Sequence, residues 1–141
     1  MKGQYLVVQF LLFFLIGLSV FLSIGNLFRY HADVFGANVA NSYRKLLNSY
    51  ISSAIIYEFS SCKQCDFINS TFIIKNETAE YFYEIYYTTS GLNVISQPGG
   101  KNYLSSVHNL NYTLSPTGSY AVSVQPINLI IDKTKNKLWI K

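Results

Sequence analysis

The N-terminal stretch constrains the fold most, because no charged side chain lies between Lys2 and Arg29. The sequence from Tyr5 to Phe28 is almost entirely apolar. A helix needs about 20 consecutive apolar residues to cross the hydrocarbon core of a bilayer, so this stretch is long enough to span one. The sequence therefore predicts a helix that is inserted in a membrane or packed among others of its kind.

Two processing routes fit the start of the chain. Ser23–Gly25 offers the small residues at which a secretory signal is cut, which would leave Asn26 as the first residue. However, the apolar stretch is longer than the roughly 7–15 residues of an ordinary secretory signal. Cleavage after Gly3 would instead leave the apolar helix on a mature protein that begins at Gln4, and we prefer this second route.

Lys2, Gly3 and Gln4, followed directly by a long apolar helix, resemble the leader of archaeal type IV pilin-like proteins, which carry class III signal peptides. In that family a prepilin peptidase cuts after the glycine. The retained helix anchors the subunit in the membrane and later forms the filament core. The resemblance covers about the first 30 residues and the order of a helix followed by a β-rich domain. One departure is Val8, which stands at the fifth mature position where many bacterial pilins have glutamate.

Small residues within the apolar stretch predict close helix packing. Ser19 and Ser23 form a small-xxx-small pair, which lets two helices approach closely. Gly17 and Gly25 extend this set on either side. A lipid-facing helix can also contain such a pair by chance, so both interpretations stay open.

The helical pattern continues past the apolar stretch to about residue 54 as an amphipathic helix with one apolar stripe. We expect this stripe to pack against the protein's own β-domain. Its members recur at spacings of three and four: Phe28, Phe35, Val39, Tyr43, Leu46, Leu47, Tyr50 and Ala54. The predicted organisation is a leader (1–3), a helix (4–54) and a β-domain (55–141). Within the helix, 4–28 is the transmembrane segment or filament core and 29–54 is the amphipathic part.

The remainder of the chain has the pattern of short strands separated by Gly, Pro and Asn turns. Such a pattern predicts an antiparallel sheet or a small sandwich, and with the helix an α+β fold. The predicted strands are Ile55–Ser60, Phe67–Ile74, Tyr81–Thr89, Leu92–Ser96, Tyr103–Val107, Leu110–Leu114, Ser119–Gln125, Ile127–Asp132 and Lys137–Ile140.

The two cysteines, Cys62 and Cys65, are the only ones in the chain. A zinc site needs further ligands at suitable spacing, and His31 and His108 are remote from this pair. A redox CxxC pair usually accompanies a βαβ pattern, which is missing here. We favour a local disulfide and hence an oxidising exterior, with free thiols, a redox pair or a metal site as the alternatives.

Three acceptor sequons, at Asn69, Asn76 and Asn111, predict N-glycosylation if the domain is exported. About two sequons would arise by chance in a chain this rich in Asn, Ser and Thr. The three sequons are informative because all of them lie in the predicted outer domain. Glycans there would add solubility to a surface with few charges.

Catalytic, cofactor and metal motifs are missing from the sequence, so we expect no enzyme, no cofactor and no metal. Glu80 and Glu84 would share one strand face, which is more typical of a solvated sheet than of a carboxylate pair. The net charge of +4 comes from scattered residues. We therefore predict a solvated C-terminal hairpin and no direct nucleic-acid binding. The basic residues at this end are Lys133, Lys135, Lys137 and Lys141.

Two functions from different classes fit these features. The first is a structural pilin-like subunit of an extracellular filament for adhesion or cell aggregation, assembled with copies of itself, a second pilin, prepilin peptidase and the pilus machinery. The amino-acid composition of the chain resembles that of pilins from thermoacidophilic archaea, including those of UV-inducible pili. Such pili are associated with cell aggregation and DNA exchange. The second is a permanently anchored β-domain that binds a surface partner such as the S-layer, similar to accessory proteins of the archaellum.

Overall fold

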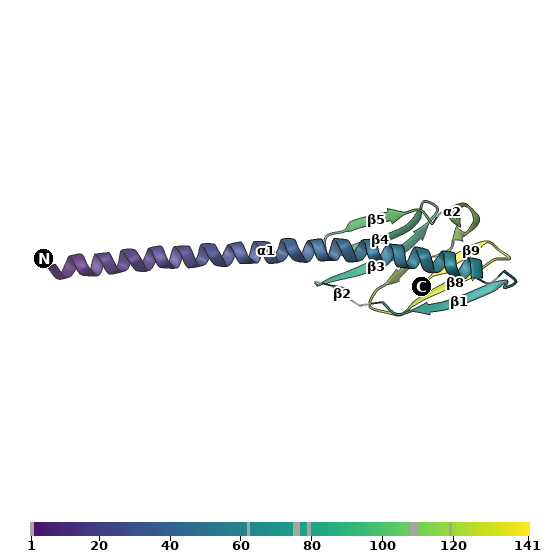
Figure 1. Cartoon of the computed structure of the whole chain (residues 1–141), viewed down its shortest axis with the longest axis horizontal. Coiled ribbons are helices and arrows are strands. Elements are labelled where there is room, and N and C mark those ends of the chain that lie inside the picture. The colour runs from purple at the N-terminus through teal and green to yellow at the C-terminus, as the bar shows by residue number, and fades with distance from the viewer. Residues whose placement is uncertain (1, 62, 75–76, 79, 108–109, 119) are drawn as a thin grey trace. The chain divides into compact units, whose positions relative to one another are not determined.

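The computed structural model describes residues 2–61, 63–74, 77–78, 80–107, 110–118 and 120–141. In these residues one long helix precedes two sheets built mainly from antiparallel strands, which confirms the predicted α+β class (Figure 1). The chain divides into two compact units, Met1–Gly36 and Ala37–Lys141. The elements are α1 (Lys2–Ser61), β1 (Phe67–Phe72), β2 (Glu77–Thr78), β3 (Tyr81–Thr88), β4 (Gly91–Gln97), β5 (Lys101–Ser105), α2 (Leu110–Thr113), β6 (Ser115–Pro116), β7 (Tyr120–Val122), β8 (Ile127–Asp132) and β9 (Lys137–Ile140).

The first sheet has the strand order β1-β8-β9-β6. β1 and β8 pair antiparallel from Phe67 opposite Asp132 to Phe72 opposite Ile127. β8 and β9 form a hairpin, and β6 runs parallel to β9. Alternate residues of β8 and β9 are buried, as period-two side-chain geometry requires for a sheet with one covered face.

The second sheet has the order β2-β3-β4-β5, and β7 also pairs with β3. β3 and β4 form a tight hairpin in which Thr88 is paired with Gly91. Gly91 has a φ of +130°, and a Cβ atom there would lie 2.1 Å from the carbonyl oxygen of Ser105. Only glycine fits this position, because β5 approaches the backbone of β4 so closely.

One hydrophobic core joins the two sheets and the part of α1 that belongs to the second unit. Tyr83, Ile85 and Tyr87 of β3 all face this core, as their alternation in the sequence predicts. The other buried apolar members are Leu47, Ile51, Ile55, Ile68, Ile74, Leu92, Val94, Val107, Leu114, Ala121, Ile127, Leu129, Ile131, Leu138 and Ile140.

The helix continues beyond the end that the sequence predicts. Residues Ile55–Ser60 are helical and α1 ends at Ser61, so the strand predicted there is wrong. Ile55 is fully buried and follows Leu47 and Ile51 at intervals of four on one helix face. Packing of this face on the sheets outweighs the strand preference of β-branched isoleucine.

The strand predicted at Leu110–Leu114 is also wrong, because this segment forms the short helix α2. The amide of Leu114 donates to the carbonyl oxygen of Leu110 over 2.8 Å. The hydroxyl of Tyr87 lies within hydrogen-bond distance of the carbonyl oxygens of both residues. This buried hydroxyl satisfies backbone groups that a short helix leaves unpaired.

The other predicted strands are confirmed. They are β1, β3, β4, β5, β7, β8 and β9, with the bounds of β8 and β9 as predicted and those of the other five differing by a few residues. Ser119, the first residue of the run predicted around β7, lies outside the described residues.

Candidate functional site

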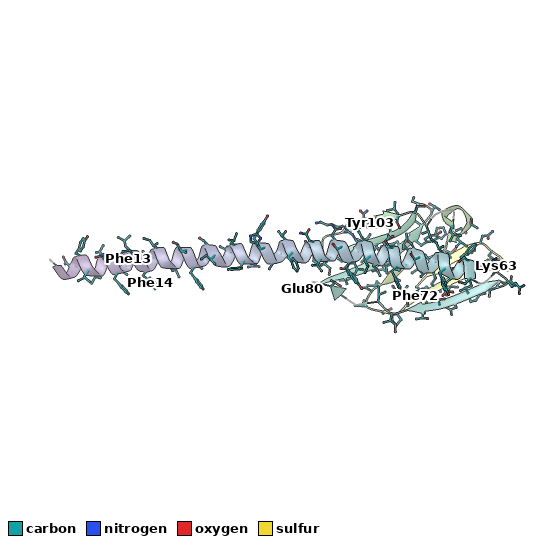
Figure 2. The ribbon with its side chains drawn as sticks, in the orientation of Figure 1. Phe13, Phe14, Lys63, Phe72, Glu80 and Tyr103 are labelled. Carbon is teal, nitrogen blue, oxygen red and sulfur yellow. The ribbon has the colours of Figure 1, made fainter. Side chains whose placement is uncertain are left out.

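The first unit presents apolar side chains on every side of its helix. All residues from Gln4 to Phe35 are exposed, and Phe21 reaches 73%. Figure 2 shows these side chains, Phe13 and Phe14 among them, standing out from the ribbon. A surface of this size on a protein in water marks a contact with lipid or with another protein. We define it as the apolar helix surface.

This helix is long and apolar enough to cross a membrane. An 18-residue window within Gln4–Ser61 has a mean hydropathy of 2.6, and none of that window is buried. Ser19 Oγ donates to the carbonyl oxygen of Ile16 over 2.8 Å, and Ser23 Oγ donates to that of Ser19 over 2.8 Å. Each hydroxyl is therefore satisfied within the helix, which removes a large cost of placing it in an apolar medium. The helix is compatible with membrane anchoring.

The predicted packing residues all lie open on this surface. A Cβ atom added at Gly17 or Gly25 would meet no atom within 4 Å outside its own helix backbone. Ser19 and Ser23 are exposed as well. Their role in bringing two helices together stays a prediction.

The predicted leader site lies at the very start of α1. Met1 and the side-chain environments of Lys2 and Gly3 lie outside the described part, and Gln4 is the first exposed side chain. Cleavage after Gly3 therefore also stays a prediction.

Within the second unit, α1 has two distinct faces. The inner face packs on the sheets and contains both apolar and polar residues. Its members, spaced by one, three or four residues, are Ala40, Arg44, Leu47, Asn48, Ile51, Ser52 and Ile55. Neither Arg44 nor Asn48 belongs to the apolar stripe expected from the sequence, yet both are buried.

The outer face carries an apolar stripe of its own, which consists of Val39, Leu46, Tyr50 and Tyr57. Successive members are seven, four and seven residues apart, which returns each side chain to the same side of a helix. Leu46, Tyr50 and Tyr57 are 65%, 52% and 69% exposed. Leu46 is therefore exposed, contrary to its predicted packing against the β-domain. Tyr50 is half exposed but contacts the ring of Phe72 in β1, with 6.1 Å between the ring centres, and the predicted packing of Leu47 is confirmed. We call these four residues the outer stripe.

A polar cluster holds the inner face to the second sheet. Asn48 Nδ2 donates to the carbonyl oxygens of Leu92 and Tyr103 over 2.9 and 3.0 Å. Asn48 Oδ1 accepts hydrogen bonds from the hydroxyls of Ser105 and Ser52. The amide side chain is fully buried, and these four hydrogen bonds satisfy its donors and acceptor. The sequence gives one signal for this cluster, the spacing of Asn48 and Ser52 by one helical turn.

The buried tyrosines serve the structure. Burial raises the pKa of both Tyr83 and Tyr87 above the ordinary value of 10.0. Burial, followed by a hydrogen bond to Glu84, raises the pKa of Tyr86. Glu84 also accepts a hydrogen bond from Gln97 Nε2 over 3.5 Å. These hydroxyls therefore remain protonated donors at neutral pH.

The expectation that Glu80 and Glu84 share one strand face is wrong. Glu84 lies in β3, whereas Glu80 lies in the turn before that strand with a φ of +67°. Among the residues whose placement is described, no group of three or more His, Cys, Asp or Glu side chains gathers as a metal site requires. His31 contacts the ring of Tyr30, and His108 lies outside the described part.

The cysteines and sequons fall partly outside the described residues. Cys65 is disulfide-bonded, while Cys62, its predicted partner, is not described, so the pairing stays a prediction. Asn69 is exposed on β1, a strand at the edge of its sheet. Asn76 and the side chain of Asn111 are not described. Glycosylation stays a prediction at all three sites.

Comparison of the chain with family models, with curated proteins and with solved structures gave no match.

Proposed function

We propose that the chain is a pilin-like subunit of an archaeal type IV pilus, which polymerises through its N-terminal helix and mediates surface adhesion or cell–cell aggregation. The observation that carries this proposal is the apolar helix surface from Gln4 to Phe35. Exposed apolar side chains on every face of a helix need lipid or other helices to cover them. A pilin-like helix uses both in turn, lipid before assembly and neighbouring helices afterwards.

The outer stripe separates this proposal from a simple anchor. A single membrane crossing uses about 20 residues, and Leu46, Tyr50 and Tyr57 lie well beyond that length. Their side chains are more than half exposed, and Tyr50 makes a ring contact with Phe72 of β1 in its own domain. A subunit that packs helix against helix along its length gives these residues a partner.

The proposed cellular location of the subunit follows from its apolar helix and the β-domain after it. The subunit would reside in the cell membrane until prepilin peptidase cuts after Gly3, and then join an extracellular filament with copies of itself and a second pilin. A Cys62–Cys65 disulfide and glycans on the β-domain would suit an oxidising exterior. No direct nucleic-acid contact is part of the proposal.

The double variant Leu46→Glu/Tyr50→Glu tests the polymerisation step. Two carboxylates on the outer stripe would have to be buried unpaired between helices, which is strongly unfavourable. We expect filaments seen by electron microscopy to be lost, while circular dichroism of the detergent-solubilised protein stays unchanged. Val124→Glu is the control, because Val124 is 56% exposed in a turn between β7 and β8. Wild-type filament yield from the double variant would contradict the proposal.

The N-terminal residue and intact mass of the native protein test the processing step. A start at Gln4 supports the pilin-like subunit, and Gly3→Trp should then block both processing and filament formation. A start at Asn26 would indicate an ordinary secreted β-domain. A retained Met1 would favour the alternative, a permanently anchored accessory protein that binds a surface partner such as the S-layer.

A further inference from the structure

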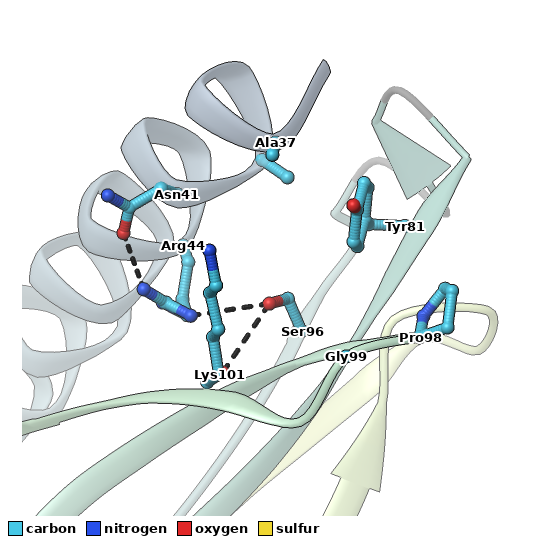
Figure 3. A pocket seen from close by; sticks show the side chains of 9 residues that line it. Ala37, Asn41, Arg44, Tyr81, Ser96, Pro98, Gly99 and Lys101 are labelled. Atoms are coloured by element: carbon cyan, nitrogen blue, oxygen red, sulfur yellow. Dashed lines mark hydrogen bonds between the residues drawn. The ribbon is translucent and has the colours of Figure 1, made fainter. Parts of the chain in front are cut away.

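A small recess lies within the second unit, between the inner face of α1 and the strands β3, β4 and β5. Arg44 and Asn41 come from the helix, Tyr81 and Ser96 from β3 and β4, and Lys101 from the start of β5 (Figure 3). Its volume of about 40 Å³ leaves space for a group of a few heavy atoms. The loop from Pro98 to Gly100 borders one side.

Arg44 is a buried cation with only neutral partners. Its side chain is 5% exposed. One terminal nitrogen donates to Asn41 Oδ1, and the other donates to Ser96 Oγ over 3.3 Å. The Nε atom has no hydrogen-bond partner. A guanidinium carries five N–H donors, so these two contacts leave much of its hydrogen-bonding capacity unused.

A second cation, Lys101, lines the same recess. Figure 3 shows the side chain of Lys101 extending from β5 toward the guanidinium of Arg44. None of the residues that line the recess is acidic. Among the described residues the ion pair found joins Lys135 to Asp132, in a different part of the domain. A buried charge is normally compensated by a partner of opposite charge, and here that partner is not supplied from within the recess.

We propose that this recess binds a single carboxylate, or an oxyanion of similar size, between Arg44 and Lys101. The planar guanidinium presents paired N–H groups that match the two oxygens of a carboxylate. Lys101, which is exposed, would contribute a compact second charge at the open side. The small volume excludes nucleotides and sugars. The carboxylate comes either from a free organic anion or from an acidic side chain of a second copy of this chain.

The two arginines of the chain make the site directly observable. Arg29 and Arg44 are the only arginines, so the Nε–Hε region of a nitrogen-15 NMR spectrum contains two signals. The full-length protein in nonionic detergent micelles is titrated with sodium acetate, and sodium chloride holds the ionic strength constant. We expect a saturable shift of the Arg44 signal and no saturable shift of the Arg29 signal, which serves as the internal control.

Lys101→Gln and Lys45→Gln form a matched pair of variants. Each removes one exposed lysine charge, but Lys45 lies over the ring of Tyr103 outside the recess. We expect Lys101→Gln to weaken acetate binding by about tenfold, while Lys45→Gln leaves it unchanged. Neither residue is buried, so both variants should fold, and circular dichroism verifies this.

Raising the protein concentration without acetate distinguishes the two sources of the carboxylate. If a second copy supplies it, the Arg44 signal shifts as the protein associates, acetate reverses the shift, and Lys101→Gln abolishes it. If the anion is free, acetate alone shifts the signal. The proposal is overturned if neither acetate nor association moves the Arg44 signal selectively, or if Lys101→Gln titrates like the wild type.

Discussion

The side chain of Asn48 connects three segments that are distant in sequence. It bridges the carbonyl oxygens of Leu92 in β4 and Tyr103 in β5, and it accepts hydrogen bonds from serines on the helix and on β5. A buried amide that satisfies both strands fixes the rotation of the helix about its own axis. Apolar contacts alone are less directional and would fix that rotation less firmly.

Replacing Asn48 by alanine should be among the most destabilising single changes in the domain. The variant removes the two bonds to the carbonyl oxygens of Leu92 and Tyr103 and takes the acceptor from the hydroxyls of Ser52 and Ser105. Leaving a buried polar group without its partner costs about 1–3 kcal/mol. We expect the free energy of unfolding, measured by urea denaturation in detergent, to fall by about 3 kcal/mol. Ser49→Ala, at the neighbouring exposed position, is the control and should change little. Equal midpoints for the two variants would show that the amide bridge contributes nothing.

Asp132 gives the domain a defined response to acid. The hydroxyl of Thr134, above all, lowers the pKa of this carboxyl below 3.8, and the amide and ammonium groups of Lys135 add to the effect. Because the folded-state pKa lies below the unfolded one, the ionised carboxylate stabilises the fold above about pH 4. That stabilisation is lost as the pH falls through the folded-state value.

The difference in unfolding free energy between wild type and Asp132→Asn should therefore be largest above about pH 4 and shrink toward pH 2. Thr134→Val should reduce this pH dependence, since it removes the main hydrogen bond to the carboxylate. Thr134→Ser retains a hydroxyl and should behave like the wild type. Denaturation midpoints across this pH range check the prediction, and parallel curves for wild type and Asp132→Asn would contradict it.

At the scale of elements, the C-terminal end of α1 is held by a residue far away in the sequence. The last turn of the helix contains no basic residue of its own. Lys133, in the turn between β8 and β9, donates from Nζ to the carbonyl oxygen of Phe59 over 2.7 Å, and its ammonium lies 4.7 Å from the centre of the Phe59 ring. A cation at this position is stabilised by the negative C-terminal end of the helix dipole.

Lys133→Met should loosen this end of the helix. Methionine keeps the apolar length of the side chain but loses the charge and the hydrogen bond, for an expected cost of about 1–2 kcal/mol. Hydrogen exchange of the amides in the last turn of α1 should accelerate more than exchange in β3. Lys141→Met, at an exposed position, is the control. Unchanged exchange in the last turn would show that Lys133 does not cap the helix.

The strands were predictable to the extent that their side chains alternate. Tyr83, Ile85 and Tyr87 follow a strict period of two, and the hairpin of β8 and β9 has a four-residue polar turn between apolar runs. The sequence analysis located strand β3 and the hairpin of β8 and β9 correctly. The two strand errors have different patterns: Ile55–Ser60 is a short run without a clear period, whereas Leu110–Leu114 alternates apolar and polar residues over only five positions. Segments this short do not separate helix from strand by their pattern, and tertiary packing decides between them.

The choice of the buried helix face could not be made from the sequence. The outer stripe, with Leu46 and Tyr50, is more uniformly apolar than the inner face, which Arg44 and Asn48 interrupt. Periodicity favours the more apolar face, but it does not reveal whether that face meets the protein's own sheet or another molecule. The burial of Arg44, and with it the recess, depends on Asn41 of the same helix and on Ser96 in β4, and no local pattern predicts the contact with β4.

At the scale of the whole molecule, the two units need different surroundings. Met1–Gly36 exposes its apolar side chains, whereas Ala37–Lys141 contains the hydrophobic core. The sequence predicted this difference well, because an uncharged apolar stretch of this length is the strongest pattern in the chain. The processing of the leader, the partner of Cys65 and the filament itself stay predictions, since each depends on another molecule or on residues outside the described part.

A chain reduced to residues 37–141 should fold without detergent, because its core lies entirely within that unit. We expect a monomer by sedimentation and a single cooperative unfolding transition. The full-length chain should require detergent or lipid to remain dispersed, because its apolar helix surface would otherwise aggregate. An unfolded or insoluble product from residues 37–141 would show that the first unit is needed for folding.

The bridge formed by Asn48 has a mechanical consequence. Within the second unit, α1 lies along the strands and is joined to them at Leu92 and Tyr103 by Asn48, and at its end by the contact of Lys133 with Phe59. A tensile load applied along the helix axis would therefore strain these attachments in shear, together, instead of peeling them apart one after another. Rupture would require several hydrogen bonds to break at once, so the domain would resist a high force along the helix axis before it separates from the helix.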